Sequence, residues 1–177
     1  MQPLLTTDRL AFYAFTPADL PVLSALHSDP EVMRYLSPCG QPWPAEVLKT
    51  KLDRFVAEHA ELGHSKWKVY RKDDGALIGR AGFSVFAPTG ELELGFVLKR
   101  EWWGHGYATE SARALIDWLF IERPRIKRVI AFAQVQNLAS KRVLEKIGMI
   151  STGTRLMEGI DYDFYLLLRR GWSRYRG

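Results

Sequence analysis

The chain has 177 residues, of which 47% are hydrophobic and 25% are charged, and its formal net charge is +5. This length suits one globular domain, and these fractions indicate neither a disordered chain nor a membrane protein. Residues 165–177 hold four arginines and no acid, which accounts for +4, and the remaining residues carry 21 basic and 20 acidic side chains. A nucleic-acid-binding face is therefore not expected, except through this basic tail of Arg169, Arg170, Arg174 and Arg176.

The first residues show no basic segment followed by an apolar run, and no run of about 18 apolar residues occurs. We therefore expect a cytoplasmic protein that does not bind a membrane. Cys39 is the only cysteine, which excludes an internal disulfide, and the histidines at 27, 59, 64 and 105 lack the paired spacing of metal ligands. No metal site is expected.

The N-terminal third predicts one strand followed by three helices. The strand is expected at 9–15. A cap residue followed by proline predicts a helix at 17–27, and the same signal at Asp29-Pro30 predicts a second, shorter helix. Apolar residues at helical spacing predict a third helix at 44–61.

The remaining chain predicts six more strands and two more helices. Turn signals separate three strands that we expect to pair antiparallel, and glycine or asparagine marks the helix ends. These elements are expected at 66–70 (strand), 77–86 (strand), 91–98 (strand), 107–121 (amphipathic helix), 128–135 (buried strand), a short helix that Asn137 caps and Gly148 ends, and a strand hairpin formed by 149–156 and 162–168.

A glycine-rich run, Trp103-Gly104-His105-Gly106-Tyr107-Ala108, lies where a strand meets a helix start. A helix N-terminus has unpaired N–H groups and a partial positive charge, so the run predicts a site for a phosphate-bearing ligand. It does not match a dinucleotide fingerprint, because Thr109 occupies the third glycine position, and the chain contains no P-loop sequence.

This run resembles the pyrophosphate motif of the GNAT superfamily of N-acetyltransferases, Arg/Gln-x-x-Gly-x-Gly/Ala. Gly106 and Ala108 match, and Trp103 stands where Arg or Gln is usual. Asn137-x-x-Ser140 followed by Glu145-Lys146-x-Gly148-Met149 resembles a second motif of the superfamily. Residues 4–36 resemble the opening of its RimJ/RimL-like branch, in Thr7-Asp8-Arg9-Leu10, Thr16-Pro17-Ala18-Asp19 and Ser28-Asp29-Pro30-Glu31-Val32-Met33, although Tyr13 stands where that branch often has Arg.

The resemblance implies one N-acetyltransferase domain over residues 1–177 that uses acetyl-CoA. Its fold would be α/β, with a mostly antiparallel twisted sheet that is flanked by helices and opens over the cosubstrate. Strand residues Phe96, Val97 and Leu98 would pair with the pantetheine arm and stabilise the oxyanion, and Asn137 would bind the same arm. The pyrophosphate would lie on Gly104, His105, Gly106, Tyr107, Ala108 and Thr109.

Amine acetylation needs a base for the amine and a proton for the departing thiolate. The resemblance suggests Glu93 as the base, directly or through water, and Ser140 as the proton donor, with Tyr165 as its substitute. Glu91 projects from the same strand face as Glu93. Three structural interpretations stay open: the two glutamates pair with basic residues, Ser140 is a helix cap, and His105 is an exposed loop residue.

The acceptor amine is left open between a protein N-terminus and a small molecule. We expect the N-terminal helices and the 156–162 loop to determine this choice. The chain could form a homo-oligomer. The alternative function is that of a non-enzymatic module with the same fold, which binds acyl-CoA or associates with the ribosome or with RNA. In that case the basic tail would contact the RNA or the ribosomal partner.

Overall fold

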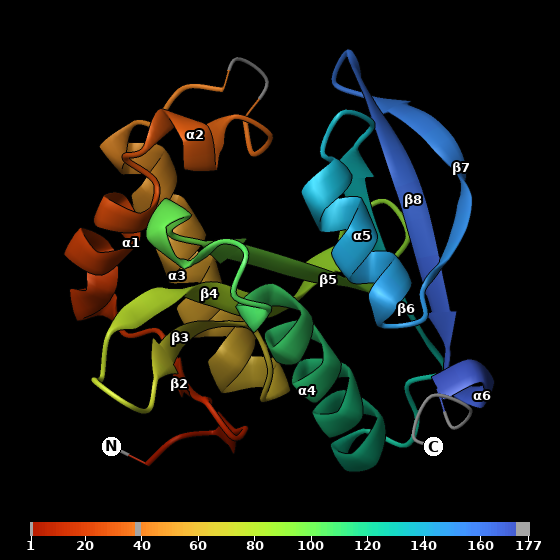
Figure 1. Cartoon of the computed structure of the whole chain (residues 1–177), viewed down its shortest axis with the longest axis horizontal. Coiled ribbons are helices and arrows are strands. Elements are labelled where there is room, and N and C mark those ends of the chain that lie inside the picture. The colour runs from red at the N-terminus through yellow and green to blue at the C-terminus, as the bar shows by residue number, and fades with distance from the viewer. Residues whose placement is uncertain (1, 38–39, 173–177) are drawn as a thin grey trace.

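The computed structural model describes residues 2–37 and 40–172 (Figure 1). Eight strands form one sheet in the order β1-β2-β3-β4-β5-β6-β8-β7, and only β5 and β6 pair in parallel. The strands are β1 (Leu5–Thr6), β2 (Leu10–Ala14), β3 (Lys66–Arg71), β4 (Leu77–Phe86), β5 (Glu91–Leu98), β6 (Arg128–Gln134), β7 (Ile150–Met157) and β8 (Ile160–Leu168).

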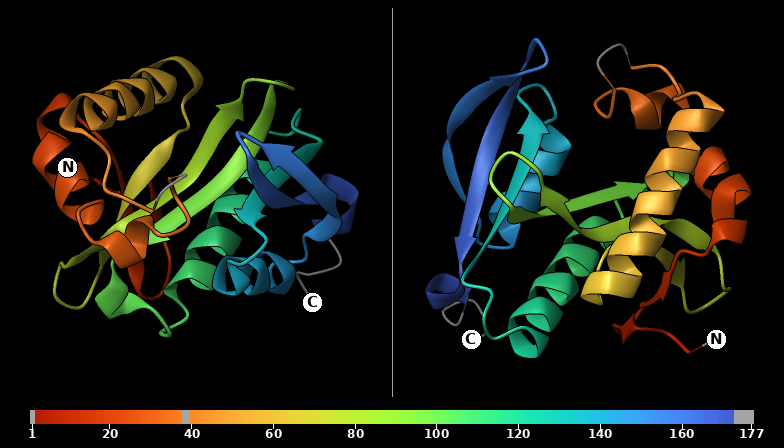
Figure 2. Two further views of the ribbon diagram at one scale, coloured as in Figure 1. Left: turned by 90° about the horizontal axis from the view of Figure 1, so that it is seen from above. Right: turned by 180° about the vertical axis from the view of Figure 1, so that it is seen from behind.

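Helices cover both faces of this sheet (Figure 2). They are the 3-10 helices η1 (Pro17–Asp19) and η2 (Arg100–Trp102) and the α-helices α1 (Leu20–Leu26), α2 (Pro30–Met33), α3 (Ala45–Leu62), α4 (Tyr107–Glu122), α5 (Leu138–Lys146) and α6 (Arg169–Trp172). α1 and α3 lie on one face, and α4 and α5 lie on the other. The prediction of a mixed α/β fold with a mostly antiparallel sheet is confirmed.

Side-chain alternation on β5 assigns a different role to each face. Leu92, Leu94 and Leu98 belong to the main core beside α4, whereas Val97 packs with Leu26 and Val32 on the α1–α3 side. Successive strand residues point to opposite faces, so β5 contributes to both layers. Its polar residues, described below, lie on the same side as Val97.

β5 and β6 separate soon after they meet. Their parallel pairing is limited to Glu93 and Ile130. Beyond that point, residues 95–98 of β5 pair with β4 but have no strand partner on the β6 side within the described residues. Figure 1 shows the two strands diverging, with α5 beside the opening. This leaves one edge of β5 available to a ligand, which the sequence could not reveal.

Nearly all sequence predictions of elements are confirmed within a few residues. The helix expected at 17–27 is divided into η1 and α1, with Asp19 closing a capping box on Thr16. β1 and α6 were missed, because segments of two and four residues show no periodicity. No helix in the described ranges is long and apolar enough to cross a bilayer.

Part of the predicted basic tail belongs to the folded structure. Arg169 donates from Nε to the carbonyl of Ile126 and from Nη2 to that of Arg123, both at 2.8 Å. This guanidinium therefore satisfies carbonyls of the segment that joins α4 to β6. Arg174 and Arg176, the outer part of the predicted tail, lie outside the described residues.

Candidate active site

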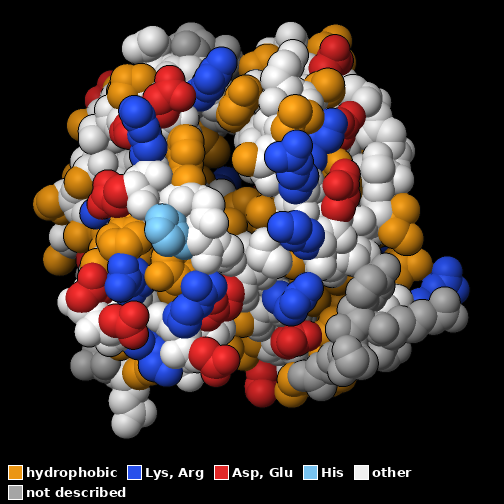
Figure 3. Space-filling model, viewed as in Figure 1, with side chains coloured by type: hydrophobic (Ala, Val, Ile, Leu, Met, Phe, Trp, Pro, Cys, Tyr) orange, Lys and Arg blue, Asp and Glu red, His pale blue; other side chains and the backbone are white. Residues whose placement is uncertain are grey.

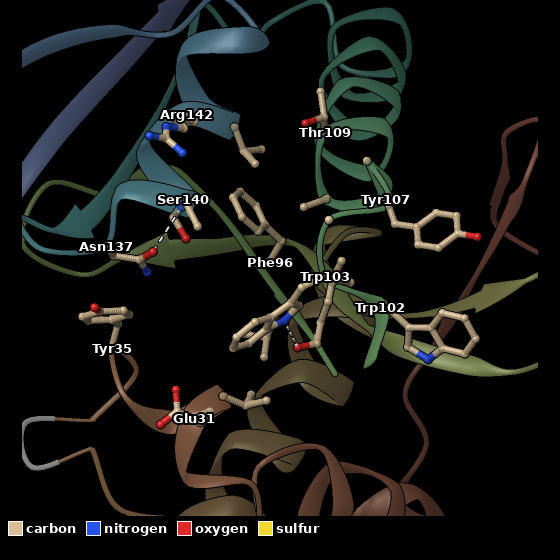
Figure 4. Close-up of a pocket in the computed structure, with 18 of the residues that line it drawn as sticks. Glu31, Tyr35, Phe96, Trp102, Trp103, Tyr107, Thr109, Asn137, Ser140 and Arg142 are labelled. Atoms are coloured by element: carbon tan, nitrogen blue, oxygen red, sulfur yellow. Dashed lines mark hydrogen bonds between the residues drawn. The ribbon is translucent and has the colours of Figure 1, made fainter. Parts of the chain in front are cut away.

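A cavity of about 450 Å³ lies where β5 and β6 diverge (Figure 4). The space-filling view shows the molecule hollowed between the α1–α3 side and the α5–β8 side (Figure 3). Its walls come from the α2 segment, β5, the loop before α4, and α5. They include most residues that the sequence predicted to bind the cosubstrate: Phe96, Val97, Leu98, Gly104, Gly106, Tyr107, Ala108, Thr109, Asn137 and Ser140.

The glycine loop takes a backbone conformation that favours glycine. Gly104 and Gly106 have φ of 80° and 81°, a left-handed region that other residues rarely adopt. Gly106 is the N-cap of α4, and the N–H of Glu110 donates to its carbonyl at 3.0 Å. The N–H groups of residues 107–109 therefore precede the first helical bond, so they remain available to an anion.

Arg9 and Glu110 hold this loop in place. Arg9 donates from Nε to the Glu110 carboxylate at 2.7 Å and from Nη1 to the His105 carbonyl at 3.1 Å, and Thr7 also donates to Glu110. Partial burial works to raise the pKa of Glu110, but the bonds from Thr7 and Arg9 outweigh it and lower that pKa. The sequence showed Thr7 and Arg9 only as part of a family resemblance, and their contact with Glu110, about 100 positions away, was not predicted.

Trp103 closes one end of the free β5 edge. Its indole Nε1 donates to the Leu98 carbonyl at 2.9 Å, and its ring lines the cavity, as Figure 4 shows. The tryptophan that replaces the usual Arg or Gln therefore binds the chain's own backbone. The rings of Trp102 and Tyr107 point away from the centre of the cavity.

The start of α5 separates the roles of two predicted residues. Asn137 is the N-cap, and its Oδ1 accepts a hydrogen bond from the N–H of Ser140 at 3.1 Å. The Ser140 hydroxyl has no hydrogen-bond partner among the described residues and lines the cavity. Ser140 is therefore not the helix cap. The interpretation of Ser140 as a cap, which was the alternative to its role as proton donor, does not hold.

α5 also brings positive charge to the cavity. Arg142 and Lys146 line it, two and six residues after Ser140, and basic side chains gather over α5 beside the hollow in Figure 3. Neither residue was predicted as part of the site. The sequence signal for this pair was their spacing of four residues on a short helix, which places both side chains on the same helix face.

Glu93 lies in an ion pair and is not part of the cavity wall. Its carboxylate accepts a hydrogen bond from Lys66 Nζ at 2.7 Å, and Nζ also donates to the carbonyls of Gly82 and Glu93. Burial lowers the pKa of Lys66, although Glu93 opposes this effect. Glu91 pairs in the same way with Arg128, at 2.7 Å. Both glutamates thus have the basic partners that the structural interpretation anticipated.

Two other predicted residues lie apart from the cavity wall. Tyr165 is 2% exposed, and its hydroxyl is 3.5 Å from a Glu145 oxygen. Burial, followed by Glu145, raises the pKa of this tyrosine. His105 is exposed and lies with its Nδ1 2.8 Å from the Trp103 carbonyl. The structure therefore brings Ser140, but not Tyr165 or His105, to the free edge of β5.

This fold and this cavity are those of an acyl-group transferase, and comparison with known proteins gives the family. The family model described as "Acetyltransferase (GNAT) domain" matches residues 9–150, so the chain belongs to the GNAT family and is an N-acetyltransferase. The "Uncharacterized N-acetyltransferase YnaD" of Bacillus subtilis is 30% identical over 175 residues, which cover 96% of this chain and 99% of that protein.

Solved structures support the same fold. An acetyltransferase from Agrobacterium tumefaciens superposes with a TM-score of 0.78 at 26% identity, covering 94% of this chain and 95% of the other. A structure titled as RimL, a ribosomal L7/L12 alpha-N-protein acetyltransferase in complex with coenzyme A, superposes with a TM-score of 0.77 at 16% identity. It covers 94% of this chain and 98% of the other, and at that identity the similarity concerns the fold alone.

Proposed function

We propose that the protein transfers an acetyl group from acetyl-CoA to a primary amine by direct attack of the amine on the thioester. One observation carries this proposal: the free edge of β5 and the unpaired N–H groups at the start of α4 line the same cavity. An extended arm that ends in a pyrophosphate suits this combination, because the arm can pair as a strand and the phosphates suit a helix N-terminus.

The binding roles follow from the walls of the cavity. The N–H groups of residues 107–109 would hold the pyrophosphate, with Arg142 and Lys146 adding positive charge. The surroundings of Gly104 leave open space for the pyrophosphate, since a Cβ at this residue would meet nothing within 4 Å. Backbone groups of Phe96 and Val97 would pair with the pantetheine amides and stabilise the oxyanion, and the Asn137 amide would bind the same arm.

The chemical step needs two proton transfers. The amine nitrogen bonds to the thioester carbon and loses a proton, and the C–S bond breaks to leave a thiolate that gains one. We assign the second transfer to Ser140, whose hydroxyl faces the cavity. We assign the first to Glu93 through a water, because its Lys66 pair keeps it from direct contact with the cavity.

The acceptor belongs to one of two kinds, a protein N-terminal amine or a small-molecule amine. The likeness of residues 4–36 to the RimJ/RimL-like branch does not decide between these two kinds. The RimL structure adds only a similar fold, although its title names a protein N-terminus as the substrate.

Calorimetric titration with acetyl-CoA, and with CoA, NADH and ATP as comparisons, tests this function. We expect selective binding of acetyl-CoA and CoA, followed by amine-dependent release of the CoA thiol. Folded protein that binds neither acetyl-CoA nor CoA would overturn the proposal. Binding without thiol release for protein N-terminal peptides and for small amines would instead support the non-enzymatic alternative.

A further inference from the structure

Four basic side chains come from α3 and from the sheet face that carries Glu93, and Arg54 among them is 53% exposed. We call Lys51, Arg54, Lys66 and Arg80 the basic layer. Arg80 on β4 pairs in register with Val97 on β5, and Lys66 on β3 pairs with Gly82 on β4. Arg80 is buried, and its guanidinium lies 5.5 Å from the centre of the Phe55 ring on α3.

Only two of these four charges have a carboxylate partner. Lys66 pairs with Glu93 at 2.7 Å, and Arg54 pairs with Glu58 at 3.7 Å. Arg80 and Lys51 have no carboxylate at ion-pair distance among the described residues. Buried charge without a partner is costly, so a natural protein rarely keeps it unless a ligand compensates it.

The surroundings of Arg80 leave most of its donors unused. It is only 7% exposed, and in the described part of the chain its one hydrogen bond runs from Nε to His27 Nε2, at 3.4 Å. His27 is neutral, because burial, and then Arg80, lower its pKa to about 3. Its Nδ1 donates to the Leu23 carbonyl at 2.8 Å, so Nε2 is an acceptor. The η nitrogens of Arg80 remain available in a geometry that suits carboxylate or phosphate.

Lys51 completes the same site from α3. Its Nζ lies 4.0 Å from the centre of the Trp43 ring, which also stacks on His27 at 5.1 Å. Burial, and then Arg80 and Arg54, lower the pKa of Lys51 to about 8, while Glu158 in the exposed turn between β7 and β8 opposes this change. A bound anion would stabilise this ammonium and the Arg80 guanidinium together.

Arg80 is close to the reacting end of the proposed cosubstrate. Residues opposite each other on antiparallel strands have Cβ atoms about 5 Å apart, and Val97, opposite Arg80, lines the cavity. A group bound by Arg80 and Lys51 would therefore belong to the acceptor, on the α1–α3 side of β5. Pyrophosphate is expected at the other end of the cavity, beside α4 and α5.

We propose that the acceptor amine belongs to a molecule that also carries a carboxylate or a phosphate, which binds Arg80 and Lys51. This inference rests on the proposed acetyl transfer and specifies its acceptor. The arrangement has a second chemical benefit, because nearby positive charges lower the pKa of a bound ammonium. They therefore favour the neutral amine that attacks the thioester.

Matched amines that differ in one anionic group test the inference. We would measure thiol release with β-alanine, β-alaninamide, O-phosphoethanolamine and ethanolamine. We expect kcat/KM to be about tenfold or more higher for the acidic member of at least one pair. Comparison of the two pairs distinguishes a carboxylate from a phosphate. Equal or lower values for both acidic members would overturn the inference.

Variants of Arg80 and Lys51 test whether these two cations cause the preference for the acidic amine. Arg80→Met and Lys51→Met should each reduce the ratio of kcat/KM for the acidic over the neutral amine by about tenfold, and Arg80→Lys should restore part of it. Lys49→Gln is the matched control, because Lys49 is on the same helix, 64% exposed and paired with Asp53. An unchanged ratio in both methionine variants, or an equal loss in the control, would contradict the assignment.

A binding measurement covers the case in which none of these amines reacts. Calorimetric titration of the CoA complex with N-acetyl-β-alanine and its methyl amide compares the same charge without turnover. Tighter binding of the acid, lost in Lys51→Met, supports the inference, and equal affinities contradict it. Failure of CoA itself to bind would instead count against the proposed function, so the two failures are distinguishable.

Discussion

Glu93 is the residue whose proposed chemistry depends most on its immediate neighbours. Lys66 reaches it from β3 across β4, and Gly95 leaves the space for this side chain. A Cβ at Gly95 would lie 2.6 Å from Lys66 Nζ and 2.8 Å from a Glu93 oxygen. The pair therefore fixes the position of the carboxylate near the β5–β6 divergence.

The variant Glu93→Gln separates catalysis from stability. If Glu93 is the base, kcat should fall by roughly 10²-fold near neutral pH while acetyl-CoA affinity changes little. The variant also leaves Lys66 buried without a carboxylate, which should lower the free energy of unfolding by about 3 to 5 kcal/mol. Kinetic measurements at a temperature where wild type and variant are both folded test the catalytic role, and Glu91→Gln is the control. A Glu93→Gln protein that is destabilised but has a normal kcat would show that Glu93 is not the base.

Ser140→Ala tests the proton donor. We expect kcat to fall by about 10²-fold with little change in melting temperature, because the Ser140 hydroxyl makes no hydrogen bond within the described residues. Asn137→Ala is the informative comparison, since it removes the cap and should cost about 1 kcal/mol of stability. A Ser140→Ala protein that loses stability but retains its kcat would indicate a structural role.

At the scale of elements, the start of α4 combines a strained turn with a binding surface. Gly106 adopts φ of 81° as the helix cap, and its carbonyl begins the helical hydrogen bonds. Arg9 and Glu110 then attach the loop to the N-terminal segment. The binding surface is thus supported both by the helix and by the residues that precede β2.

Gly106→Ala should weaken acetyl-CoA binding by about tenfold or more, because the left-handed conformation costs an alanine roughly 1 to 2 kcal/mol and the loop would relax away from the anion. Gly75→Ala provides a matched control in the β3–β4 turn, where φ is 68° and a Cβ would meet nothing within 4 Å. Both variants should lose similar stability in chemical denaturation. Equal acetyl-CoA affinities by calorimetry would show that loop geometry does not control binding.

At the scale of the whole molecule, stability should depend on pH through buried histidines. His27 titrates near 6.5 when unfolded but has a folded pKa of about 3, because of burial and Arg80. The unfolded chain therefore binds the proton first, and unfolding becomes easier as pH falls from 6.5 toward 3, by up to about 1.4 kcal/mol per pH unit. The lowered pKa values of His59 and His64, both due first to burial, act in the same direction.

Urea denaturation of the wild type and His27→Gln at pH 7, 6 and 5 measures this effect. Glutamine can still donate and accept a hydrogen bond, so the variant mainly removes the titration. We expect a smaller loss of unfolding free energy between pH 7 and 5 in the variant. Parallel losses in the two proteins would show that His27 does not contribute.

Elements whose signals are local could be predicted from the amino-acid sequence. Proline and cap residues located the helix starts, alternating apolar residues located the strands, and the two glycines identified the loop before α4. Asn137 was also correct as a cap, because capping involves residues only three positions apart. These features depend on neighbours along the chain, so their physical cause is present in the sequence.

Contacts between residues that are distant in the sequence became visible only in the folded chain. The opening between β5 and β6 depends on where pairing stops, at Glu93 and Ile130. Lys66 reaches Glu93 from 27 positions away, and Arg9 reaches Glu110 from 101 positions away. The unpaired charges of Arg80 and Lys51 likewise exist only because α3 covers this face of the sheet. Charge, burial and free hydrogen-bond donors are properties of packed surroundings, and packing is fixed by the fold as a whole.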